Sequence, residues 1–181
     1  MCDHDRPIRP LATAMSRRAF VTRAAIGAGV ALVSTVAPWR VMAAGNTEAL
    51  LLSCMDYRLM DDIVRYMDGR GLTDRYDHVI LAGAALGVLN DKYPAWGQTF
   101  WDHVGVAIEL HHIAKIIVMD HRDCGAYKVF LGPDVAKDAA TERAAHAAEM
   151  HKLRAEIGRR HPGLAVELLL MDLAGRVETI A

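Results

Sequence analysis

The chain has 181 residues, of which 52% are hydrophobic and 24% are charged, and it carries three cysteines and a formal net charge of −1 at pH 7. This composition excludes a disordered, collagen-like or disulfide-dense protein. The nearly neutral charge gives no overall basic field, so we expect no nucleic-acid partner. The length allows one domain and a tail.

The N-terminal segment over residues 1–44 differs in charge from the rest of the chain. It contains six of the 21 Lys and Arg residues but only two of the 22 Asp and Glu residues. Arg17 and Arg18 precede an uncharged stretch, residues 24–39, that is rich in Ala, Gly and Val, and small residues follow it. This order is typical of an export signal. It resembles a twin-arginine signal, which implies recognition by the twin-arginine export machinery.

We therefore interpret residues 1–44 as a signal peptide and residues 45–181 as an exported, periplasmic domain. The sixteen uncharged residues are short for a membrane helix, which needs about 20. We expect no stable membrane span. A buried core helix and an uncleaved signal that acts as a tether are the alternatives.

Apolar runs and helical periodicities alternate along residues 45–181. Strands are predicted at 49–53, 78–81, 115–119 and 166–171, with a short edge strand at 177–180, and helices at 60–69, about 95–112 and 141–160. The alternation predicts an α/β fold, with a mostly parallel β-sheet flanked by helices and a short antiparallel edge strand. Ligands bind such sheets at the carboxyl ends of the strands. We therefore expect the chemistry to follow the first and third strands.

Reactive side chains follow both of these strands. Cys54, Asp56 and Arg58 come after the first strand, and an extended chain would place all three on one side. His121 and Cys124 come after the third strand, close enough for a tight turn to bring them to one ion. Two Cys and one His suit zinc, and three protein ligands leave a fourth tetrahedral position open, as in catalytic zinc sites.

Other interpretations of these residues exist. Cys54 and Cys124 could form a disulfide in an exported protein, although His121 would then have no role, or they could be two unrelated buried thiols. The Asp56–Arg58 pair could be a surface salt bridge of little energetic worth. Asp123, inside the second motif, could support the residues around the ligands or be merely solvated, and we favour the solvated interpretation.

The paired motifs, CxDxR from Cys54 and HxxC from His121 with a Gly next, resemble those of the β-class carbonic anhydrases. The resemblance covers nearly all of residues 48–180 and extends to the strand spacing and the final strand–turn–strand. The short domain and the CMDYR variant look like a compact bacterial subgroup of that family.

The resemblance implies one Zn²⁺ per chain, held by Cys54, His121 and Cys124, with an Asp56–Arg58 catalytic dyad beside it. It implies the reversible hydration of carbon dioxide to bicarbonate by zinc-bound hydroxide, which makes the chain a zinc lyase. No other cofactor is expected. It also implies a homodimer or a dimer of dimers, with active sites near the subunit boundary.

The chain departs from the family pattern in residues 80–87, which lack the Asn of an Asn-Ala-Gly element that many members carry. A more apolar pocket there favours a hydrolase of carbonyl sulfide or carbon disulfide on the same site. A non-catalytic zinc-binding protein that retains the fold is another alternative, and so is a thiol redox protein, although CxxC is absent. His103, His111 and His112 are candidates for a proton shuttle.

Aromatic residues gather between positions 93 and 101, more than one helix face buries easily. Trp96, beside Pro94 near a helix start, is our best candidate for an anchor of a two-fold interface. Packing against the chain's own sheet is the alternative for Phe100 and Trp101.

Overall fold

A computed structural model describes residues 47–181, and the signal predicted for residues 1–44 lies outside them. One five-stranded sheet has the order β2-β1-β3-β4-β5. The strands are β1 Ala49–Cys54, β2 Tyr76–Leu81, β3 Lys115–His121, β4 Ala165–Met171 and β5 Val177–Thr179. The first four are parallel and β5 runs antiparallel to β4, which confirms the predicted fold class.

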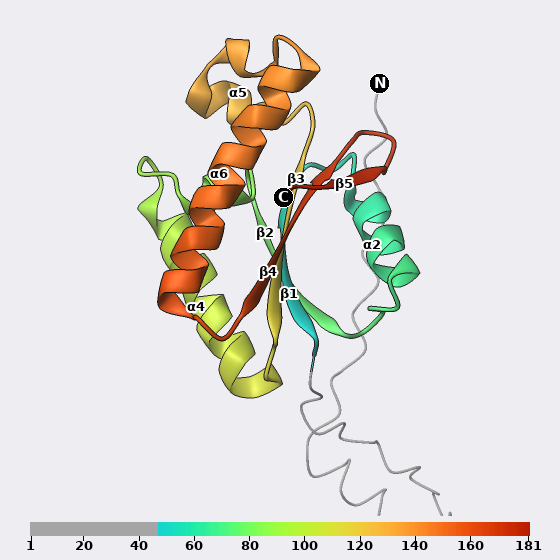
Figure 1. Ribbon diagram of the computed structural model, residues 1–181, viewed down its shortest axis with the longest axis vertical. Helices are drawn as coiled ribbons and strands as arrows, with labels where there is room; N and C mark the ends of the chain where they lie inside the picture. Colours follow the sequence, from blue (N-terminus) through green and yellow to red (C-terminus); the bar gives the residue numbers. More distant parts are fainter. Residues whose placement is uncertain (1–46) are drawn as a thin grey trace, which may run out of the picture. The chain divides into compact units, whose positions relative to one another are not determined.

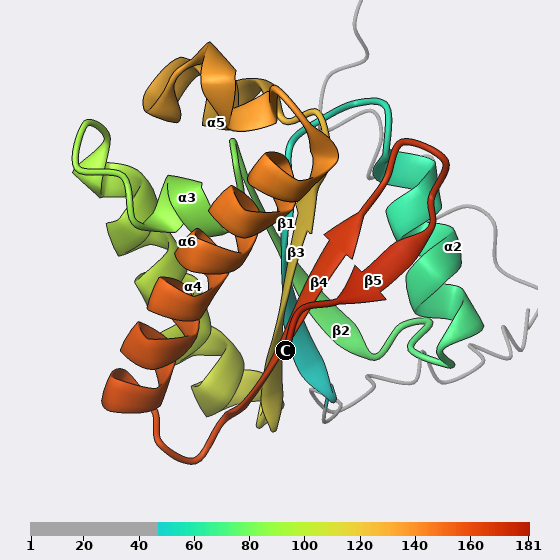
Figure 2. The same ribbon diagram turned by 45° about the horizontal axis from the view of Figure 1, so that its top comes forward.

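Three long helices cover the two faces of this sheet. Helices α4, Pro94–His111, and α6, Ala139–Arg160, lie on one face, and α2, Met60–Gly69, lies on the other (Figures 1 and 2). Three short segments were not predicted: α3 Ala85–Val88, α5 Gly125–Leu131 and the 3-10 turn η1 Pro133–Ala136. Segments this short show no helical period in the sequence. No helix within the described residues is long and apolar enough to cross a membrane.

The sheet buries apolar side chains on both faces, as parallel sheets do, and this explains the near-continuous apolar runs of its strands. The face under α4 and α6 has the larger cluster, to which the central strands contribute Leu50, Leu52, Ile116 and Val118. The face under α2 has a smaller cluster, which includes Leu51, Ile117, Ile63 and Met67. Strands β1 and β3 therefore lie in the interior of the sheet and are packed on both faces.

The topology creates a crevice at the carboxyl ends of β1 and β3. The chain passes from β1 through α2 to β2 on one side of β1, and then through α3 and α4 to β3 on the other side. Ligands bind at such switch points in open α/β sheets. Ser53 of β1 lies beside Met119 of β3, so both predicted motifs leave the sheet at the same edge.

Candidate metal centre

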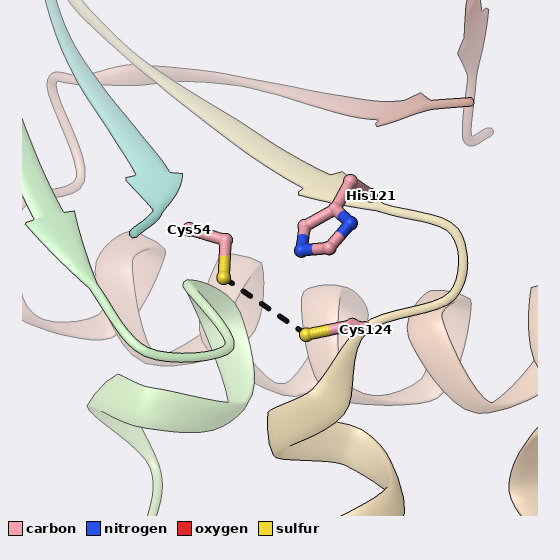
Figure 3. Close-up of side chains that lie close together, drawn as sticks. All are labelled: Cys54, His121 and Cys124. Carbon is pink, nitrogen blue, oxygen red and sulfur yellow. Dashed lines mark hydrogen bonds between the residues drawn. The ribbon is translucent and has the colours of Figure 1, made fainter. Parts of the chain in front are cut away.

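Three predicted ligands meet at this edge. Cys54 ends β1, His121 ends β3, and Cys124 comes directly before α5, with the three side chains pointing toward one another (Figure 3). One ligand atom from each lies within 4.8 Å of the others, and the two Sγ atoms are 3.9 Å apart. All three residues are buried.

A tight turn allows His121 and Cys124 to converge. Asp123 adopts the left-handed conformation, with φ of 57°, and Asp is one of the residue types that tolerate it. Cys124 returns to an extended conformation immediately before α5 begins at Gly125. The turn therefore directs Cys124 back toward the end of β3.

The donor atoms suit a metal ion. His121 Nδ1 donates a hydrogen bond to the Arg122 carbonyl oxygen at 2.8 Å, which leaves the lone pair on Nε2. That Nε2 atom is buried and has no hydrogen-bond partner. Metal-ligating histidines typically have this arrangement, because the bond at one nitrogen fixes the tautomer of the other.

The two thiols are free, and their sulfur atoms are far beyond the 2.05 Å of a disulfide bond. Their hydrogen bond lowers the pKa of Cys54, which also accepts from the Gly83 N–H at 3.3 Å. The same hydrogen bond, together with burial, raises the pKa of Cys124. The metal-free site thus favours one thiolate and one thiol. A set of two sulfurs and one imidazole nitrogen fits zinc, which would displace the remaining proton.

The Gly83 donor was not predicted from the sequence. Gly83 has φ of +78°, and a Cβ there would lie 3.0 Å from the Ala126 Cβ. Both facts favour glycine, because the left-handed conformation and the close approach would strain another residue. A glycine in a small-residue turn after β2 was the available signal.

Asp56 and Arg58 form a bidentate ion pair beside the ligands. Arg58 Nε donates to Asp56 Oδ1 at 2.9 Å, and Nη2 donates to Oδ2 at 2.7 Å. These hydrogen bonds lower the pKa of Asp56 to about 2, so its carboxylate is ionised at neutral pH. Asp56 Oδ2 lies 3.8 Å from His121 Nε2. The expectation of an extended segment is wrong, because the chain turns at Tyr57 and Arg58, and this turn brings the two side chains together.

Asp123 is a third member of this charged group, which corrects our interpretation of it as merely solvated. Arg58 Nη1 donates to Asp123 Oδ2 at 2.9 Å, and Nη2 donates to the Asp123 carbonyl oxygen at 3.2 Å. Lys128 also pairs with its carboxylate. Contacts with Lys128 and Arg58 lower the pKa of Asp123. Arg58 therefore links the two motifs across 65 positions of sequence.

The candidate shuttle histidines lie elsewhere. His111 pairs at 2.8 Å with Asp77, which lies near the start of β2, whereas the ligands lie at or just after the carboxyl ends of β1 and β3. His103 contacts the Thr99 carbonyl oxygen, and His112 is the left-handed residue after α4. The structure brings none of the three to the metal centre.

A cavity of about 340 Å³ opens beside the ligands. Its walls are mainly apolar and are formed by Met55, Tyr57, Ala82, Ala126, Val129 and Phe130. Met55, Tyr57 and Val129 are also highly exposed to solvent. The site thus combines an apolar cavity with a charged group, and Asp56 of that group also lines the cavity.

The predicted aromatic cluster lies behind one wall of this cavity. Trp96 stacks on Tyr93 with 4.5 Å between ring centroids, and both rings meet Phe130 edge-on. Phe100 is fully buried in the core, as the alternative interpretation expected. Trp96 is partly buried within its own chain, and its role in an interface stays a prediction.

Comparison with known proteins identifies the family. The sequence pattern of the family described as "Putative carbonic anhydrase" matches residues 44–181. This chain belongs to that family. Its relatives include an uncharacterized protein of Rickettsia conorii, 45% identical over 135 residues, which are 75% of this chain and 73% of the relative. An uncharacterized protein of Rickettsia bellii is 40% identical over 75% of this chain and 82% of its own.

Solved β-carbonic anhydrases share the fold of this family member. The β-carbonic anhydrase CafA of Aspergillus fumigatus matches with a TM-score of 0.51 at 15% identity, over 75% of this chain and 76% of its own. CafD of the same fungus also has a TM-score of 0.51 at 15% identity, over 80% and 94%. The Coccomyxa β-carbonic anhydrase has a TM-score of 0.50 at 16% identity, over 77% and 74%. At these identities the likeness is one of fold.

Proposed function

We propose that this chain is a zinc-dependent carbonic anhydrase that catalyses the reversible hydration of carbon dioxide to bicarbonate and a proton. The observation that carries the proposal is the convergence of Cys54, His121 and Cys124 within 4.8 Å, with the unpartnered His121 Nε2 among them. A zinc ion held there would supply a coordinated water that loses its proton near neutral pH.

The residues around the ligands suit this reaction. The ionised Asp56 carboxylate can only accept hydrogen bonds, so it can orient the attacking water beside His121 Nε2. Arg58 holds both Asp56 oxygens in a fixed fork, and it is itself anchored to Asp123. Because Arg58 engages both Asp56 oxygens, we propose that a water, and not Asp56, takes the fourth ligand position.

The cavity suits a small substrate without charge. Its apolar walls would receive carbon dioxide readily, while a charged product would gain little from them and would leave into water. The same apolar lining also favours a second candidate, the hydrolysis of carbonyl sulfide or carbon disulfide at the same site. Both reactions would begin with attack of the oriented water on the central carbon.

Stopped-flow measurement of carbon dioxide hydration by the zinc-loaded protein tests the proposal, with carbonyl sulfide hydrolysis measured in parallel. We expect hydration well above the buffer rate, and the rate should rise with pH as the reactive water ionises. The Cys54→Ser, Cys124→Ser variant is the matched control and should show only the buffer rate. Turnover of carbonyl sulfide alone would favour the second candidate, and turnover of neither would contradict the catalytic proposal.

We further propose that two copies of the chain assemble across the rim of the cavity. The exposed Met55, Tyr57 and Val129 would be covered in such a dimer, which supports burial of this rim. Light scattering at low micromolar concentration tests assembly, and a monomer with full activity would contradict it.

We also propose export through the twin-arginine machinery, on the strength of Arg17 and Arg18 and the apolar stretch after them.

A further inference from the structure

A second buried cluster lies directly behind the candidate metal centre. Asp120, which precedes His121 in β3, is 1% exposed. Its Oδ2 accepts hydrogen bonds from the Tyr127 hydroxyl at 2.5 Å and from His146 Nδ1 at 2.9 Å. Its Oδ1 accepts from the Ala85 N–H at 3.1 Å. We call this carboxylate and its three donors the Asp120 hub.

The first branch of the hub leads to Cys54. Ala85 is the first residue of α3, and it follows the strained turn at Ala84, where φ is 39°. Two residues before Ala85 stands Gly83, whose N–H donates to Cys54 Sγ. A carboxylate that holds the Ala85 N–H thus fixes the turn that presents the Gly83 donor to the sulfur.

The second branch leads to Cys124. Tyr127 belongs to α5, which begins directly after Cys124, and its hydroxyl is anchored on Asp120. The anchored tyrosine therefore fixes the position of α5 and, with it, of Cys124 directly before the helix.

The remaining branches fix His121 and the outer helix. Asp120 is joined covalently to His121, so the position of its carboxylate constrains the backbone from which that ligand extends. His146 belongs to α6, which covers one face of the sheet (Figures 1 and 2). Its Nε2 is buried without a hydrogen-bond partner, so the ring acts in the hub through Nδ1 alone.

The stability of the fold alone does not explain why the Asp120 carboxylate is buried. Asp120 lies inside β3 directly after an apolar run, in which Ile116 to Met119 are all buried. Removing a carboxylate from water is costly even when donors surround it, and none of its three donors is a Lys or Arg side chain. An apolar residue would continue the strand at less cost, but it could not gather donors from α3, α5 and α6.

We propose that Asp120 is a positioning residue for the metal centre, holding the segments that carry Gly83, His121 and Cys124 in the geometry that binds zinc. It touches neither the predicted ligand atoms nor the cavity, and it acts through Tyr127, Ala85 and the β3 backbone. The inference rests on the proposed zinc site but not on the reaction catalysed there.

Metal release and the spectrum of a cobalt(II) probe test this inference on the full chain. Asp120→Asn keeps the shape of the side chain but places its amide N–H group against the donors of the Asp120 hub. Tyr127→Phe removes only the hydroxyl that donates to Asp120. Because partners of metal ligands typically contribute 10–100-fold to affinity, we expect Asp120→Asn to release zinc to a chelator about 10–100 times faster than the unmodified chain. Tyr127→Phe should show a smaller change in the same direction. In both variants the thiolate-to-cobalt and ligand-field bands should shift.

Ile157→Val is the matched control, because it removes one methyl group from a fully buried position of α6 at a distance from the hub. It should lower stability and leave zinc release and the cobalt spectrum unchanged. If Asp120→Asn fails to fold, Tyr127→Phe carries the test, because it deletes a single hydrogen bond.

Wild-type zinc release and spectrum in a folded Tyr127→Phe would overturn the proposal, as would an equal shift in Ile157→Val. Absence of carbon dioxide hydration in the unmodified chain would contradict the proposed function and leave this metal-binding test intact.

Discussion

Two carboxylates flank the candidate metal centre, and they are held in opposite ways. Asp56 lies at the mouth of the site, where the charged Arg58 and a solvent-exposed turn keep it ionised. Asp120 lies behind the site, almost fully buried, and is held by a hydroxyl, an imidazole and a backbone N–H. One carboxylate faces the cavity side of the ligands and the other faces the core.

This difference fits the two roles that we propose, a role in the reaction for Asp56 and a role in holding the site together for Asp120. A carboxylate that orients a reacting water must be accessible and must keep its charge, and an ion pair at the surface achieves both while adding little to stability. A carboxylate that joins secondary-structure elements works best where water cannot compete for its donors. We therefore expect changes at Asp56 to affect mainly turnover, and changes at Asp120 to affect mainly stability and metal retention.

The largest expected effect is the loss of the zinc ion, because the roles proposed for Asp56 and Asp120 both depend on it. Cys54→Ser with Cys124→Ser should reduce bound zinc from about one ion per chain to near zero, because two of the three ligands lose their thiolate. Elemental analysis of the purified full chain measures this. Cys2→Ser, which changes the one other cysteine of the sequence, is the control and should retain the metal. Full zinc occupancy in the double variant would contradict the ligand assignment.

Asp120→Asn should produce the largest loss of stability. Its amide cannot accept from all three donors, so buried polar groups are left unpaired, and we expect the free energy of unfolding to fall by about 3 kcal/mol. Urea titration of the metal-free chain measures the loss apart from any effect of zinc. A loss below about 1 kcal/mol would mean that the hub is loosely held, and the contrast with Asp56 would disappear.

Asp56→Asn should show the opposite pattern. Zinc content should stay near one per chain, and stability should change by less than about 1 kcal/mol, because the lost ion pair lies at the surface, where solvent screens it. The rate of carbon dioxide hydration should fall about 100-fold, since the amide presents a donor where the reacting water needs an acceptor. Stopped-flow kinetics beside elemental analysis measure both properties. Unchanged kcat/KM at full zinc content would remove Asp56 from the mechanism.

The sequence predicts the long elements of the fold and the three candidate ligands, but not the short helices beside them. The strands and long helices are predictable because buried parallel strands are apolar throughout and a helix of 18 or 22 residues repeats its pattern several times. Cys54, His121 and Cys124 are predictable because they follow strand ends at metal-ligand spacing. Helices α3 and α5 are too short for any period to appear.

The contacts that complete the site are not visible in any local pattern. Arg58 reaches Asp123 across 65 positions, and Asp120 meets His146 across 26. Such pairs depend on the order of strands in the sheet and on how helices pack over it, which one sequence does not report. Asp120 did leave a trace, as an acidic residue that directly follows the apolar run of β3.

The smallest effect expected is the response of the Asp56–Arg58 pair to acid. Arg58 lowers the pKa of Asp56 to about 2, below the ordinary value of about 3.9 for an unfolded chain. A depressed pKa contributes stability that is fully present above about pH 4 and is lost as the pH falls through about 2. Solvent screening keeps the contribution small, because a third of the Arg58 side chain is exposed.

A double-mutant cycle with Asp56→Asn and Arg58→Ala, measured by urea unfolding of the metal-free chain, isolates the coupling of the two residues. This coupling should be present at pH 6 and should shrink toward zero near pH 2. A coupling that stays constant over this range would show that the pair does not depend on the charge of Asp56, and the outer carboxylate would then be held, like the inner one, by its hydrogen bonds alone.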